Sequence, residues 1–241
     1  MESGKREIAD RSINVMSLIH WRMITRHHPS AFLLAAQLIS LALYVALEGV
    51  PGGQFLLGAF GMVVLLLVVW VVIRSPAINW IAWIITGLAI LLLLLSWLLV
   101  NPALLIWATL LEAALYFYGA GGLIIYMMGD DRVTTDDLFA AGATFTLIAW
   151  GFAYLYLVCQ AWNPGAFAYG THPKEPLNFI ELLFLSFANL SATGLSDIVP
   201  ITAPSRVLVM LEQFAGVAYI AVVVSRLIGL TIVRYQDKGT S

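Results

Sequence analysis

The residues best suited to chemistry form a short polar stretch between two long apolar runs: Ser191, Ala192, Thr193, Gly194, Leu195, Ser196 and Asp197. Backbone of this kind cannot face lipid, because its N–H and C=O groups would be left unpaired there. Free carbonyl oxygens at membrane depth can instead replace the water around a cation. We therefore expect the carbonyls of this stretch to favour a cation.

A short helix should aim its carbonyl end at this stretch. Asn178 followed by Glu181 is the pattern of an N-cap with its capping-box acid, and it predicts a helix over 179–190. A helix of about 12 residues is about 18 Å long, too short to cross a bilayer core of about 30 Å. The chain must therefore enter the membrane and turn back. The carbonyl end of the helix carries partial negative charge, which favours cations.

The elements around this hairpin follow from composition. The chain has 241 residues, of which 61% are hydrophobic and 11% charged, and its mean hydropathy is +0.91. We expect an all-α integral membrane protein with six transmembrane helices and the re-entrant segment between the fifth and sixth. The apolar runs lie at 31–49, 54–73, 77–99, 103–128, 138–161 and 204–230. Gly119, Gly121 and Gly122 could kink or divide the fourth run.

Lys and Arg residues predict the orientation. Ten lie on one set of joints and two, Lys174 and Arg206, on the other, so both termini should be cytoplasmic in a multi-pass protein of the cell (inner) membrane. Residues 1–30 are then a cytoplasmic segment. Within it, 11–28 suits either an amphipathic helix on the membrane surface or a basic tail that only sets orientation. Residues 235–241 form a short cytoplasmic tail.

The order of helix, short helix, polar loop and helix resembles the pore domain of the potassium channel superfamily. Residues 192–197 stand where that family has Thr-Val-Gly-Tyr-Gly-Asp, and Pro200, Thr202 and Arg206 also match in type. The stretch from Arg132 to Leu230 resembles small bacterial six-span members. The resemblance implies a pore domain over 138–234, with outer helix 138–161, pore helix 179–190, filter 191–197 and inner helix 204–230. It also implies a homotetramer, a gating hinge at Gly216, and a monovalent cation, with no other metal, at the carbonyls of residues 191–196. Asp197 would then lie at the outer mouth.

Three filter positions depart from the family pattern. Ala192 replaces a threonine whose hydroxyl forms an ion site in the family. Leu195 replaces a tyrosine that the family braces against two pore-helix tryptophans, whose positions are Phe184 and Leu185 here. Ser196 replaces a glycine of positive φ, which would cost a residue with a Cβ about 1–2 kcal/mol. We expect an altered filter with weak potassium selectivity.

Two acids lie inside predicted spans, where they need a partner or water. Glu212 could make a structural hydrogen bond behind the filter or line the ion pathway. Glu112 should pair with another span, and a proton-sensing role is its alternative. The first four spans, residues 31–128, have no row of arginines in 103–128, so voltage sensing by moving arginines is not expected.

These features predict passive conduction of K⁺ or Na⁺ by a cation channel of potassium-channel type. A non-conducting channel-like protein with an interaction or sensing role is the alternative. A secondary transporter would need a second copy of the 178–197 pattern, and the sequence contains none. No enzyme motif, cofactor site or nucleic-acid-binding pattern is expected. The predicted partners are the lipid bilayer and other copies of the chain.

Overall fold

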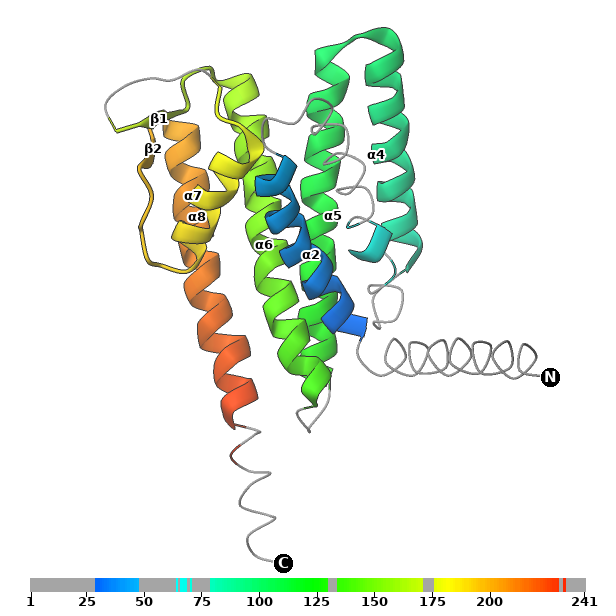
Figure 1. Ribbon diagram of the computed structural model, residues 1–241, viewed down its shortest axis with the longest axis vertical. Helices are drawn as coiled ribbons and strands as arrows, with labels where there is room; N and C mark the ends of the chain where they lie inside the picture. Colours follow the sequence, from blue (N-terminus) through cyan, green and yellow to red (C-terminus); the bar gives the residue numbers. More distant parts are fainter. Residues whose placement is uncertain are drawn as a thin grey trace, which may run out of the picture.

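The computed structural model describes residues 29–47, 64, 66–68, 70, 79–129, 134–170, 176–229 and 232. Its helices are α2 (Pro29–Leu47), α4 (Asn79–Leu99), α5 (Pro102–Gly129), α6 (Thr135–Trp162), α7 (Phe179–Leu190) and α8 (Ala203–Tyr219), which continues into the π-helical turn η1 (Ile220–Val224). Two short strands, β1 (Phe167–Tyr169) and β2 (Ile198–Pro200), flank α7 in sequence. Figure 1 shows α5, α6 and α8 running along the long axis, with the shorter α7 beside α8 in the upper half.

Three helices of the described chain are long and apolar enough to cross a membrane: Pro102–Gly129, Thr135–Trp162 and Ala203–Gly229. Both α5 and α6 have 28 residues, about 42 Å of helix, against a bilayer core of about 30 Å. No break divides α5, which runs as one helix past Gly119, Gly121 and Gly122.

The shorter apolar helices α2 and α4 fall at the first and third predicted runs. Of the second run, only residues 64, 66–68 and 70 are described, and they are helical. The total of six transmembrane helices therefore stays a prediction. The amphipathic segment 11–28 and the tail 235–241 lie outside the described residues.

Helix α6 is the centre of the bundle and packs against α2, α5, α7 and α8. A capping box starts it, in which Thr134 Oγ1 accepts from Asp137 N and Asp137 accepts from Thr134 N. The preceding acid, Asp136, is buried and accepts from Ser30 Oγ of α2 at 2.9 Å. This buried hydrogen bond joins the start of α2 to the start of α6.

The two strands correct the expectation of a purely helical fold. They pair antiparallel, with Phe167 opposite Pro200 and Tyr169 opposite Ile198. The sequence around them contains turn residues and shows no strand alternation, so the pairing was not predicted. Because β1 precedes α7 and β2 follows the polar loop, the chain leaves and returns at one end of the bundle (Figure 1).

Candidate functional site

The start of α7 has the capping geometry that the sequence predicts. Asn178 Oδ1 accepts from Glu181 N at 3.0 Å, and Glu181 Oε2 accepts from Asn178 N at 2.8 Å. The other carboxylate oxygen of Glu181 accepts from the Tyr169 hydroxyl at 2.6 Å, which ties α7 to β1. Burial and this hydrogen bond to Glu181 raise the pKa of Tyr169 to about 12.

The polar loop begins as a cap on the carbonyl end of α7. Ala192 N donates to Asn189 O at 3.0 Å, while Thr193 N and Gly194 N both donate to Ala188 O, at 3.1 and 3.0 Å. These bonds satisfy carbonyls that a helix end otherwise leaves unpaired. The first half of the loop is therefore wound onto the helix.

The backbone strain lies at a different residue from the one predicted. Among the described non-glycine residues, positive φ occurs at Val100 and Ala192, and not at Ser196. A helix commonly ends with a left-handed residue just after its C-cap, and the C-cap here is Ser191. Ala192 takes that position with φ 57°. The end of the helix therefore determines where the left-handed residue falls.

Three carbonyl groups of the loop point away from α7. No peptide bond in the described chain is cis, and in a trans peptide the C=O points opposite to the N–H of the next residue. The N–H groups of Ala192, Thr193 and Gly194 point at the end of α7. The carbonyls of Ser191, Ala192 and Thr193 therefore point away from α7. Ala192 and Thr193 are exposed in the single chain.

The two hydroxyls at the start of the loop are already engaged with the helix. Ser191 Oγ donates to Phe187 O at 2.6 Å, and Thr193 Oγ1 donates to Ala188 O at 3.2 Å. The two hydroxyl oxygens lie 3.0 Å apart. Oxygen ligands for a cation would therefore come from the backbone of this loop more readily than from its side chains.

Backbone contacts hold the chain after the loop. Asp197 O accepts from Gly170 N at 3.0 Å, and Ile201 N donates to Ala166 O at 2.8 Å. Ser196 Oγ accepts from Ile198 N at 3.1 Å. Asp197, predicted at the outer mouth, is exposed.

Behind the loop, Glu212 joins three helices. Its side chain is 0% exposed and accepts hydrogen bonds from the hydroxyls of Tyr156 on α6 and Ser186 on α7. Ser186 Oγ also lies 2.7 Å from the Ala149 carbonyl of α6. The sequence singled out Glu212 but not its partners, whose only signal is that they are polar residues inside apolar helices.

Gly216 allows α7 and α8 to make backbone contact. A Cβ at this position would lie 2.0 Å from the Leu190 carbonyl oxygen at the end of α7. The π-helical turn η1 follows four residues later and was not predicted. The contact of α8 with the end of α7 at Gly216 thus lies one helical turn before the point where the helical geometry of α8 changes.

The remaining predicted residues fall into two environments. Leu185 is buried against the core, whereas Phe184 is 52% exposed and Leu195 is 75% exposed. The single chain therefore leaves the side chains of Phe184 and Leu195 uncovered. Glu112 lies near the stacked rings of Tyr116 and Tyr154, whose centroids are 5.4 Å apart.

Comparison with protein families gives one finding for this region. Residues 142–232 match a family model described as "Ion channel", and the match runs from α6 through α7 and the polar loop to beyond η1. No curated protein and no solved structure matches the chain. The match and the long apolar helices support a membrane protein with an ion-channel function.

Proposed function

We propose that this chain is a subunit of a passive cation channel of potassium-channel type, with K⁺ or Na⁺ as the permeant ion and weak selectivity between them. The observation that carries the proposal is the direction of the carbonyls of residues 191–193. Carbonyl oxygens can replace the hydration shell of a cation. The partial negative charge at the end of α7 favours positive charge at the same place.

One copy of the loop supplies too few oxygens to surround an ion, so we propose a homotetramer around a central axis. Closed symmetric rings are the usual form of such assemblies, and each copy would supply one quarter of each carbonyl ring. The exposed side chains of Phe184, Leu195 and Phe214 support this arrangement, because they leave apolar area on α7, the loop and α8 uncovered in one chain.

Weak selectivity follows from the chemistry of the loop. Ala192 has no hydroxyl to offer an ion, and the hydroxyls of Ser191 and Thr193 are engaged with α7. Leu195 cannot donate a hydrogen bond that would brace the loop against Phe184. Selectivity depends on the number and arrangement of coordinating oxygens. This loop offers fewer oxygens held in a fixed position than the filter pattern of the potassium channel superfamily does.

The wound start of the loop also favours a second candidate, a channel-like interaction or sensing protein that does not conduct. Four successive N–H groups, those of residues 191–194, bond back to α7. A loop wound in this way leaves fewer extended residues for ion sites than a fully extended loop would.

Gly216 as a gating hinge belongs to the conducting proposal. In that proposal η1, which begins four residues later, would share the bending.

The test is ion current through the purified full-length protein in planar bilayers, with K⁺ on one side and Na⁺ on the other. The proposal expects current with a reversal potential near zero. Strong potassium selectivity would overturn the weak-selectivity part, and absence of current with either ion would favour the non-conducting alternative. Ala192→Thr, which adds a hydroxyl to the loop, should raise the preference for K⁺.

The orientation is proposed with both termini in the cytoplasm of the inner membrane. Single cysteines introduced near each end and in the loop after α6 would test it by labelling intact cells with an impermeant reagent. The loop site should react and the two terminal sites should not.

A further inference from the structure

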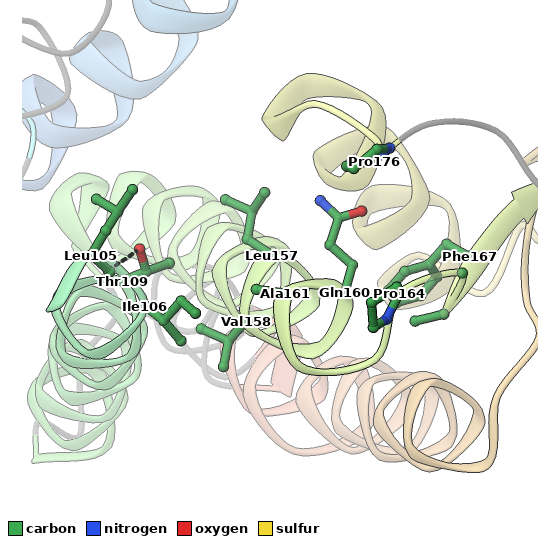
Figure 2. Close-up of a pocket in the computed structure, with 12 residues that line it drawn as sticks. Leu105, Ile106, Thr109, Leu157, Val158, Gln160, Ala161, Pro164, Phe167 and Pro176 are labelled. Atoms are coloured by element: carbon green, nitrogen blue, oxygen red, sulfur yellow. Dashed lines mark hydrogen bonds between the residues drawn. The ribbon is translucent and has the colours of Figure 1, made fainter. Parts of the chain in front are cut away.

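A cavity of about 820 Å³ lies apart from the polar loop and from Glu212. Its walls include Leu105 and Ile106 of α5, Leu157 and Ala161 of α6, and Pro176 before α7. Figure 2 shows the α5 side chains on one side of those from α6, with Pro176 on another. Its volume falls within the range of about 300–1,000 Å³ that is usual for small-molecule sites.

The cavity lies at the depth where lipid headgroups meet acyl chains. Leu105 and Thr109 are three and seven residues into α5, which begins at Pro102, and so lie about 4 to 10 Å along the helix. Trp107 and Trp162 pack edge to face at the same level, with ring centroids 6.0 Å apart, and both are exposed. Exposed tryptophans concentrate at the membrane–water interface.

The polar side chains of the lining already have partners. They are Thr109 and Gln160. Thr109 Oγ1 donates to Leu105 O at 2.9 Å. Gln160 Nε2 donates to Leu177 O at 2.7 Å, and Gln160 Oε1 accepts from Leu177 N at 3.0 Å. Among the residues that the structure describes, the lining has no charged side chain, so this part of the wall offers little to a polar or charged ligand.

We propose that this cavity binds one acyl chain of a membrane lipid. An acyl chain is apolar like the walls, is small enough for the volume, and is present at this depth of the membrane. The site does not depend on ion conduction. It lies beside the start of α7, at the opposite end of that helix from the polar loop, because Gln160 in its wall bonds both backbone groups of Leu177, directly before the N-cap Asn178.

The experiment is native mass spectrometry of the purified full-length protein after detergent removal of loosely bound lipid. Phosphatidylcholine and phosphatidylglycerol with identical acyl chains are the two probes. Each protein chain of the wild type should retain one lipid molecule, whichever of the two lipids is supplied. The reason is that the lining contacts the acyl chain and not the headgroup. Retention of phosphatidylglycerol alone, or of no lipid at all, would overturn the proposal.

Ala161→Trp fills the cavity and should reduce lipid retention at least tenfold. Ala114→Trp is the matched control, because it makes the same change at an exposed position of α5 that does not line the cavity. Where size-exclusion chromatography shows that Ala161→Trp does not fold, Ile106→Trp fills the cavity from the α5 side. Equal retention by the folded cavity-filling variant and the control would overturn the proposal.

Discussion

The contact between α7 and α8 predicts that Gly216→Ala destabilises the protein. The added Cβ would lie 2.0 Å from the Leu190 carbonyl oxygen, where an ordinary C···O contact is about 3.3 Å, so the two helices must separate by about 1.3 Å. Overpacking of this kind costs about 1–3 kcal/mol. For a chain of this size that lowers the Tm by about 2 to 12 °C.

The same displacement should disturb the site. Glu212 lies one helical turn before Gly216 on the same face of α8, so a shift of α8 from α7 lengthens its hydrogen bond with Ser186. Ion current should therefore fall along with stability. The assay is thermal unfolding of the purified full-length protein in detergent, followed by tryptophan fluorescence, with current measured on the same preparation.

Gly229→Ala is the control for this prediction. A Cβ at Gly229 meets no atom within 4 Å, while alanine brings both helical positions the same gain in helix propensity, about 1 kcal/mol. The difference between the two variants therefore isolates the contact with Leu190. The reasoning fails if Gly216→Ala melts at or above the temperature of Gly229→Ala.

Substitutions at three further positions test other contacts by thermal unfolding. Glu212→Gln keeps an acceptor and gains a donor for the two buried hydroxyls, whereas Glu212→Ala removes the carboxylate acceptor of Tyr156 and leaves Ser186 the Ala149 carbonyl. The loss of a buried partner should cost about 1–3 kcal/mol, and equal stability of the two variants would contradict the role of this cluster. Tyr169 has a pKa raised from 10.0 to about 12, so its contribution to stability is complete below pH about 10 and is lost as the pH rises to about 12. The stability difference between wild type and Tyr169→Phe should shrink over that interval, and parallel pH curves would argue against the bond to Glu181. Asn178→Ala should cost about 0.5–2 kcal/mol through loss of the N-cap, and Asn178→Ser should cost less; equal losses would exclude a capping role.

The features predicted well are those decided within a few residues. Helix α7 starts at Phe179 because Asn178 and Glu181 satisfy its first N–H groups, and it ends at Leu190 where the polar stretch begins. Both signals can be read from neighbouring residues. The lengths of α5 and α6 likewise follow from uninterrupted apolar sequence.

The features that were missed depend on distant pairings. Tyr156 and Glu212 are 56 residues apart, and polarity alone does not show which buried groups meet. The β1–β2 pairing is also long-range, and three residues per strand give no alternation to recognise. The strain expected at Ser196 was carried over from a family pattern, whereas the local end of α7 decides that Ala192 is the left-handed residue.

The arrangement separates the groups that hold the loop from the groups that it presents. Glu212, Leu190 with Gly216, and the Gln160–Leu177 clamp are all behind or beside α7. The carbonyls of residues 191–193 lie on the opposite, exposed side. Changes behind α7 should therefore act on stability and current together, because they move the helix that carries the loop. Ala192→Thr instead adds a ligand oxygen on the exposed side without moving α7, so it should alter selectivity. Because Thr is β-branched and φ at this position is 57°, the Tm should fall as well.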